Sequence, residues 1–282
     1  MTQHDGRILV CTDLDRTLLP NGDAPESPDA RPRFGALTQH PEVTLAYVTG
    51  RHRELVLAAI GEFAIPVPAF VISDVGSTIF RIEDGVWSAW DAWGTRIAKD
   101  WGGWSRSQLA DLLEGIPGLR LQEPEKQGIF KLSYYAPEDW DRATHLPDIE
   151  ERLQTAGVWA SLIWSLDETT GTGLFDLLPA RATKRHAIEF LMEEEGFASE
   201  NTVCAGDSGN DLPVLTSSLQ AVLVANATDA VRTEALAEAE RQRTVDTLYL
   251  AQGEFRGMNG NYAAGILEGL AHYIPATADM WS

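Results

Sequence analysis

Two aspartates stand directly after the first apolar stretch of the sequence. Residues 7–12 (RILVCT) predict a short buried strand, and Asp13 and Asp15 follow it. Side chains two positions apart on an extended segment point to the same side, so the two carboxylates project together. They would repel each other unless a cation lies between them or one binds a proton, and Mg²⁺ prefers such oxygen ligands. Because surface turns also use Asp freely, this spacing alone fits an ordinary turn as well.

A second acidic cluster follows another apolar stretch late in the chain. Residues 201–206 (NTVCAG) predict a buried strand that ends at Asp207, and Asn210 and Asp211 come where a helix is predicted to start. Backbone N–H groups at a helix start can hold an anion or orient a metal-bound water. Taken alone, Asp207 could simply cap the helix. Two such clusters at the ends of two buried strands are harder to explain in that way, and together they favour a functional site.

A hydroxyl group and an ammonium group complete the candidate site. Thr49, Gly50 and Arg51 follow another apolar stretch, residues 43–48, and Lys184 opens a predicted helix. If these residues converge with the acids, the acids could hold a metal ion while Thr49 and Lys184 neutralise phosphoryl oxygens, as phosphoryl transfer requires. Lys184 also fits a solvated helix lysine, since lysine is mostly exposed.

The composition excludes several classes of protein. The 282 residues include 22 Lys and Arg against 42 Asp and Glu, a formal net charge of −20, and 44% are hydrophobic. Such a chain is long enough for a core and a smaller second domain, and its composition argues against a disordered or disulfide-stapled protein. An acidic surface repels phosphate backbones and anionic lipid heads, so we expect neither nucleic acid nor a membrane as a partner.

Cysteine usage and the N-terminal residues indicate the compartment. Cys11 and Cys204 each lie inside an apolar run, which predicts buried free thiols in a reducing compartment. The polar first residues do not resemble a secretory signal, and no run of about 18 apolar residues occurs. We therefore expect a cytoplasmic protein.

The order of the apolar segments predicts the elements that carry the site. In the first and last parts of the chain, continuous apolar strands alternate with helical patterns, which indicates a parallel sheet covered on both faces. The middle part contains eight of the nine tryptophans and strands of alternating polarity. We predict an α/β fold in which residues 1–84 and 173–282 form a Rossmann-like parallel-sheet core and residues 85–172 form an inserted α+β domain.

Four short motifs, taken in order, resemble those of the haloacid dehalogenase-like (HAD) phosphatases. They are residues 13–17 (DLDRT), 49–51 (TGR), Lys184 and residues 206–211 (GDSGND). The long insertion before Lys184 is similar to the capped type IIB branch, which implies a HAD core with a C2-type cap. Four further stretches are similar to sucrose-phosphate phosphatases: residues 73–77 (SDVGS), 130–135 (FKLSYY), 178–184 (LPARATK) and 264–269 (AGILEG).

The resemblance implies a role for each matching residue. Asp13 would be the nucleophile that forms a phosphoaspartate, and Asp15 the acid that protonates the leaving oxygen and then activates water. Magnesium, the implied cofactor, would be held by Asp13, the main chain of Asp15, Asp207 and, in support, Asp211. The residues implied to contact the substrate or its phosphate are Thr49, Gly50, Arg51, Lys184, Asn210 and Lys131.

Two features leave the identity of the substrate open. Arg16 stands where the family more usually has a small or amide residue, and its cation could hold an anionic group of the substrate or pair with an acid. The tryptophans of the inserted domain could stack on sugar rings or simply fill its core. Tyr134, Tyr135 and Lys131 lie on a predicted strand of that domain and are candidates to face the site.

These observations predict a Mg²⁺-dependent phosphatase that hydrolyses a sugar phosphate, with sucrose 6-phosphate as the leading candidate. The alternatives are a phosphatase for mannosylfructose phosphate or glucosylglycerol phosphate, a sugar phosphomutase, and a non-catalytic sugar-sensing module. The complete set of acids and lysine argues against the last. We expect a monomer, and the candidate partners are the small-molecule sugar phosphate and a glycosyltransferase (synthase) of the same pathway.

Overall fold

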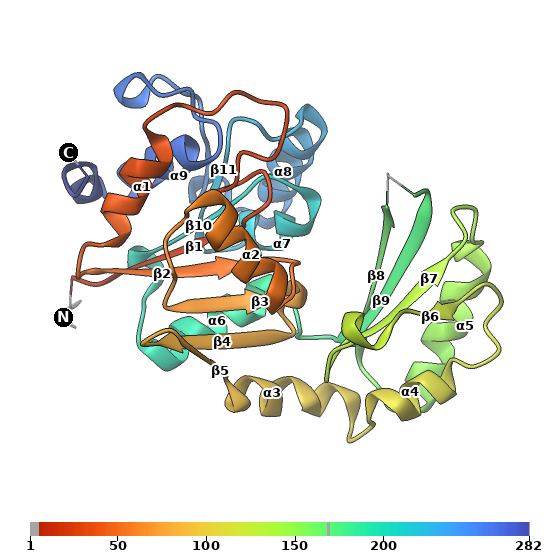
Figure 1. Cartoon of the computed structure of the whole chain (residues 1–282). Coiled ribbons are helices and arrows are strands. Elements are labelled where there is room, and N and C mark those ends of the chain that lie inside the picture. The colour runs from red at the N-terminus through yellow and green to blue at the C-terminus, as the bar shows by residue number, and fades with distance from the viewer. Residues whose placement is uncertain (1–5, 168–169, 282) are drawn as a thin grey trace.

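The computed structural model describes residues 6–167 and 170–281. Among these residues the strands form two separate sheets, one of eight strands and one of four (Figure 1). The strand order is β12-β11-β10-β1-β2-β3-β4-β5 in the larger sheet and β6-β7-β9-β8 in the smaller. The fold is therefore α/β, as the sequence predicts.

The larger sheet and its helices come from both outer parts of the chain. Its strands are β1 (Ile8–Thr12), β2 (Val43–Val48), β3 (Phe70–Ser73), β4 (Thr78–Glu83), β5 (Val86–Ala89), β10 (Thr202–Gly206), β11 (Gln220–Leu223) and β12 (Leu248–Leu250). The helices that pack on it are α1 (Ala30–Thr38), α2 (Arg53–Phe63), α3 (Asp91–Ala98), α6 (Lys184–Glu195), α7 (Leu212–Leu215), α8 (Asp229–Gln242) and α9 (Ala263–Tyr273).

Strand β1 shows how both faces of the larger sheet are buried. Ile8 and Val10 join a core cluster with α1, α2 and α9, whereas Leu9 and Cys11 join a second cluster with α3, α6, α7 and α8. All four side chains are at most 4% exposed. Burial on both faces explains why the strand is apolar without alternation.

The pairing of the strands creates a place for a ligand. The strands from β12 to β3 pair in parallel, and β4 and β5 add an antiparallel hairpin at one edge. Strand β1 lies between β2, the next strand in the sequence, and β10, which comes much later. The strand order therefore reverses direction at β1. Open α/β sheets bind ligands at the carboxyl ends of strands at such a switch point.

The smaller sheet has helices packed on one face. It consists of the antiparallel strands β6 (Arg120–Leu121), β7 (Leu132–Ala136), β8 (Ala160–Asp167) and β9 (Thr172–Pro179), and its helices are α4 (Arg106–Leu112) and α5 (Arg142–Thr155). Tyr134 packs in the core between the sheet and these helices and is 5% exposed. The prediction that Tyr134 faces the site is therefore wrong. Alternate side chains on a strand point to opposite faces, and Tyr134 is on the face that packs against the helices.

The edges of the two sheets fall a few residues from the predicted division of the chain. Strand β5 lies within the predicted insertion but belongs to the larger sheet, and β9 begins at Thr172 in the smaller one. Trp93 is buried on the larger sheet, 5.2 Å from the ring of Phe190, and Trp87 and Trp90 also pack there. These three rings do not fill the core of the smaller sheet, because the chain runs back along the larger sheet before it crosses.

The cysteines and helices bear on two further predictions. Cys11 and Cys204 are buried and free, as predicted, and lie opposite each other on β1 and β10. No helix within residues 6–167 and 170–281 is long and apolar enough to cross a membrane.

Candidate active site

The carboxyl ends of three adjacent strands bring the candidate residues to one edge of the larger sheet. Asp13 follows β1, Thr49 follows β2 and Asp207 follows β10, and β1 pairs with both of the other strands. Side chains that are far apart in the sequence therefore meet, as the pattern of buried strands predicts.

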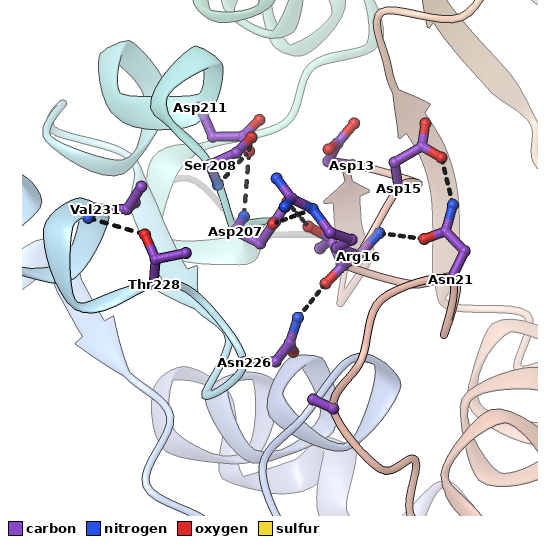
Figure 2. A network of polar contacts seen from close by, with 12 residues as sticks. Asp13, Asp15, Arg16, Asn21, Asp207, Ser208, Asp211, Asn226, Thr228 and Val231 are labelled. Atoms are coloured by element: carbon purple, nitrogen blue, oxygen red, sulfur yellow. Dashed lines mark hydrogen bonds and ion pairs between the residues drawn. The ribbon is translucent and has the colours of Figure 1, made fainter. Parts of the chain in front are cut away.

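Three carboxylates and one ammonium group form the centre of this site. Asp13, Asp207 and Asp211 each offer a carboxylate oxygen, and these oxygens lie within 4.8 Å of one another (Figure 2). Lys184 Nζ lies 3.0 Å from Asp13 Oδ1 and 2.7 Å from Asp211 Oδ1. All four residues are at most 5% exposed. Lys184 is therefore not a solvated helix lysine.

Burial changes the proton affinities in this acidic cluster. Desolvation raises the pKa of Asp13 to about 7, although Lys184 opposes the change, and raises the pKa of Asp207 to about 6. For Lys184, burial alone would lower the pKa, but Asp13 and Asp211 hold it above the ordinary lysine value. Lys184 thus carries its charge at neutral pH.

The acidic cluster is suited to a metal ion. The Lys184 ammonium group and the Arg16 guanidinium, 3.2 Å from Asp207, carry two positive charges, fewer than three ionised carboxylates need, and buried charges require partners. Carboxylate oxygens are the hard ligands that Mg²⁺ and Ca²⁺ prefer. The chemistry of the donors therefore fits a divalent cation bound among Asp13, Asp207 and Asp211.

Local backbone structure places Asp211 and Lys184. A Cβ at Gly206 would lie 2.5 Å from Asp211 Cβ, so only glycine lets the acid approach the strand end. Asp211 Oδ2 also accepts a hydrogen bond from the N–H of Ser208 at 3.2 Å. Helix α6 begins at Lys184, and the Thr183 hydroxyl accepts a backbone N–H of its first turn.

The loop after β3 presses against the start of α6. Residues 74, 75 and 76 have φ angles of +50°, +60° and +106°, three consecutive left-handed conformations. A Cβ at Gly76 would lie 2.3 Å from the carbonyl carbon of Thr183 and 2.7 Å from the nitrogen of Lys184. The indole N–H of Trp93 donates to the Gly76 carbonyl at 3.0 Å. This loop therefore helps to fix the backbone from which Lys184 projects.

Arg51 binds a neighbouring carboxylate. Its Nε and Nη2 donate to Asp15 Oδ2 and Oδ1 at 2.8 and 2.6 Å, and Asn21 Nδ2 donates to Asp15 Oδ1 at 2.7 Å. Burial alone would raise the pKa of Asp15, but these hydrogen bonds hold it below its usual value. The structure places Arg51 beside the predicted acid, and its contact with phosphate stays a prediction.

Arg16 has a left-handed backbone conformation, with a φ of +57°, and its side chain reaches one acid of the cluster. Its Nε is 3.2 Å from Asp207 Oδ2, and the side chain is 52% exposed. Its N–H donates to Asn21 at 2.8 Å, and its carbonyl accepts from Asn226 at 2.6 Å (Figure 2). Of the two roles that the sequence leaves open for Arg16, this arrangement shows the pairing with an acid.

The remaining predicted residues divide between the acidic cluster and a neighbouring cavity. The Thr49 hydroxyl is buried at the strand end, and Asn210 Oδ1 accepts from Lys184 Nζ at 3.2 Å. Gly50 and Lys131 instead line a cavity of about 530 Å³ between the edge of the larger sheet and the smaller sheet. The structure thus places these two residues beside the acidic cluster and not within it.

Two residues near the acidic cluster were not predicted. Thr17 Oγ1 donates to Asp207 Oδ1 at 3.1 Å, and Asn226 holds the main chain of Arg16. Asn226 comes shortly after β11, at the edge where Asp207 follows β10, and this position after a buried strand is a signal that identifies it as a candidate. Thr17 lies inside a quoted motif, but its spacing does not reveal which acid it contacts.

The family model described as Sucrose-6F-phosphate phosphohydrolase matches residues 6–274, nearly the whole chain. The chain belongs to this family of HAD-like hydrolases. A protein of Nitrosococcus oceani, named as a HAD-like hydrolase, is 54% identical over 271 residues, or 96% of this chain and 73% of that relative. The mannosylfructose-phosphate phosphatase of Agrobacterium fabrum is 27% identical over 267 residues, or 94% and 96%.

A comparison with solved structures also finds a sucrose-phosphatase. The sucrose-phosphatase of Synechocystis, crystallised with sucrose and phosphate, matches with a TM-score of 0.69 and 25% identity over 95% of this chain and 98% of that chain. The chain spans only 51% to 60% of the sucrose-phosphatases of two plants that it matches. The predicted resemblance to HAD phosphatases and to sucrose-phosphate phosphatases is confirmed.

Proposed function

We propose that the chain is a Mg²⁺-dependent phosphatase that hydrolyses a sugar phosphate, with sucrose 6-phosphate as the leading substrate. The observation that carries the proposal is the buried contact of 3.0 Å between Lys184 and Asp13 inside a cluster of three carboxylates. A carboxylate held beside an ammonium group can receive a phosphoryl group whose oxygens the ammonium group then neutralises. Membership of the family supports the same chemistry.

In the first proposed step, a carboxylate oxygen of Asp13 attacks phosphorus while the bond between phosphorus and the sugar oxygen breaks. Asp15 gives a proton to that leaving oxygen, and an acyl phosphate forms on Asp13. In the second step, water attacks phosphorus and gives a proton to Asp15, and the bond to Asp13 breaks. Inorganic phosphate leaves and the Asp13 carboxylate is restored. Lys184 neutralises charge on the phosphoryl oxygens, and the Thr49 hydroxyl orients them by donating a hydrogen bond, in both steps.

The hydrogen bonds from Arg51 affect the first step. They stabilise the ionised form of Asp15, whereas an acid must hold a proton. At least one of them has to open before Asp15 can protonate the leaving oxygen. Arg51 then becomes available to the phosphate or the sugar, which is the role that we propose for it.

The residues that we propose to hold Mg²⁺ are Asp13, Asp207, Asp211 and the main-chain carbonyl of Asp15. The ion supplies positive charge that stabilises the phosphoryl group as it is transferred. Arg16 lies 3.2 Å from Asp207 and so supplies a countercharge to the same carboxylate. A cation bound to Asp207 therefore has to compete with the Arg16 guanidinium.

The cavity of about 530 Å³ beside Gly50 is the proposed position of the sugar. Its volume lies within the range of small-molecule sites, roughly 300–1,000 Å³. The smaller sheet and its loops contribute polar side chains to the lining, among them Arg120, Lys126 and Tyr135, which suits a leaving group rich in hydroxyls. We propose accordingly that the smaller sheet, with its helices α4 and α5, acts as a cap that determines the substrate.

The test is phosphate release with Mg²⁺ from a panel of esters: sucrose 6-phosphate, mannosylfructose phosphate, glucosylglycerol phosphate, hexose phosphates and phenyl phosphate. We expect sucrose 6-phosphate to have the highest kcat/KM, by about 100-fold or about 2.7 kcal/mol over hexose phosphates. A preference for mannosylfructose phosphate would instead assign the activity named for the Agrobacterium relative. No release from any ester would contradict a phosphatase, and a requirement for a sugar bisphosphate would indicate a phosphomutase.

A further inference from the structure

Asp74 stands at the same sheet edge as the acidic cluster but takes no part in the proposed phosphoryl transfer. Its N–H donates to the carbonyl of Arg51 at 3.2 Å, and the N–H of Val75 donates to the carbonyl of Thr49 at 3.2 Å. Asp74 and Val75 both have left-handed backbone, which is unfavourable for a β-branched residue. Backbone strain of this kind is concentrated at functional sites. Here it accompanies a carboxylate that lines the 530 Å³ cavity.

Asp74 forms a group of alternating charges with two residues of the smaller sheet and its loops. Lys131 Nζ lies 3.9 Å from Asp74 Oδ1 and 3.9 Å from Asp176 Oδ2. Hydrogen bonds of this type span about 2.7–3.2 Å, so neither carboxylate takes a direct hydrogen bond from the ammonium group. The protons of Lys131 remain available to an oxygen atom that enters between the two sheets.

The Asp74 carboxylate is also poorly supplied with donors. Its side chain is only 21% exposed, and among the described residues the hydroxyl that donates to it is that of Ser73, at 3.3 Å. Burial raises the pKa of Asp74 above its usual value even though Lys131 opposes the change. A phosphate group would be repelled by this carboxylate, whereas neutral hydroxyl groups would supply the donors that it lacks.

We propose that Asp74 is a specificity-determining residue supplied by the larger sheet, and that its carboxylate binds hydroxyl groups of the leaving sugar together with the ammonium group of Lys131. One hydroxyl donates to Asp74, and the oxygen of the same or the adjacent hydroxyl accepts from Lys131. The substrate class is therefore a phosphate ester whose leaving group carries neighbouring hydroxyls. This inference rests on the proposed function.

The test compares two substrates in three variants. Asp74→Asn removes the charge at constant size. Asp74→Gly removes the whole side chain, and glycine adopts the positive φ of this position without strain. Asp84→Asn is the matched control, because Asp84 is exposed on the turn between β4 and β5 and has the same φ of +50°. Each protein is assayed with the best sugar phosphate of the panel and with phenyl phosphate, which carries no hydroxyl on its leaving group.

We expect Asp74→Asn to lower kcat/KM for the sugar phosphate about 10- to 100-fold and to leave phenyl phosphate within about twofold of the unmodified chain. Asp74→Gly should show the same selective loss, and Asp84→Asn should change neither substrate. An equal loss on both substrates would make Asp74 a structural residue of the loop, and no loss on the sugar phosphate would overturn its role. If the unmodified chain releases no phosphate from any sugar ester, the proposed function fails first, and this inference fails with it.

Discussion

The contact between Gly76 and the start of α6 allows a direct test of how the position of Lys184 is maintained. In Gly76→Ala, the new Cβ would lie 2.3 Å from the carbonyl carbon of Thr183, 2.5 Å from its oxygen and 2.7 Å from the nitrogen of Lys184. All three are backbone atoms, so no side chain can rotate away. The loop and the helix start must separate instead.

The size of the effect follows from these distances. Carbon atoms in contact lie about 3.5–4.0 Å apart, so the separation has to grow by about 1 Å or more. A displacement of about 1 Å in catalytic geometry can lower the rate about 100-fold. Lys184 contacts Asp13 at 3.0 Å, and we expect kcat to fall by about that factor. Alanine at a φ of +106° adds a backbone cost of about 1–3 kcal/mol to the loss of stability.

Gly85→Ala is the control for the backbone cost alone. Gly85 also has a positive φ, +78°, but no atom lies within 4 Å of the position of its Cβ. Both variants are assayed for steady-state phosphate release and for thermal unfolding. We expect both to unfold at lower temperature than the unmodified chain, and only Gly76→Ala to lose kcat. If Gly76→Ala retains the same kcat as Gly85→Ala, the loop does not position Lys184.

Four further predictions concern the acidic cluster. Asp13→Asn should abolish phosphate release without lowering the thermal unfolding temperature; appreciable residual turnover would point to a different nucleophile. Without metal, the pKa values of Asp13 (about 7) and Asp207 (about 6) exceed the usual aspartate value of about 3.9. Between these values the folded state binds more protons than the unfolded state. The free energy of unfolding of the metal-free chain should therefore fall as pH rises from about 4 to 7. If the ionised carboxylates hold Mg²⁺ as proposed, the rise in unfolding temperature on adding Mg²⁺ should be larger at pH 8 than at pH 5.5. A shift independent of pH would contradict this metal site. Arg16→Ala removes an exposed cation 3.2 Å from Asp207, so half-maximal activity should need about two- to fivefold less Mg²⁺, and a higher requirement would show that Arg16 assists the metal instead.

Strand positions and the acidic residues at their ends were predictable from the sequence. Strand β1 is apolar throughout because helices cover both of its faces, and this continuous pattern identifies a strand of a parallel sheet. Once the parallel strands are recognised, Asp13, Thr49 and Asp207 must share one sheet edge. Only the resemblance to a family predicted that Lys184 is a buried site residue and not a solvated helix lysine, because its position on a helix does not reveal its burial.

Other features depend on tertiary contacts that leave no local pattern. Trp93 lies within the predicted insertion, but it packs on the larger sheet because the chain turns back along β4 and β5. The backbone of Gly76 lies against the start of α6, which is more than 100 residues away in the sequence. The ion pair between Arg51 and Asp15 likewise joins two motifs whose spacing says nothing about their mutual contact.

The claim that Asp13 is the nucleophile can be tested by trapping the acyl phosphate. Borohydride reduces an acyl phosphate of aspartate to homoserine, which mass spectrometry of the digested chain locates. We expect homoserine at position 13 when the chain is quenched during turnover with Mg²⁺ and a sugar phosphate, and none when substrate is omitted. Homoserine at another aspartate, or active turnover with position 13 unmodified, would contradict the central role assigned to Asp13.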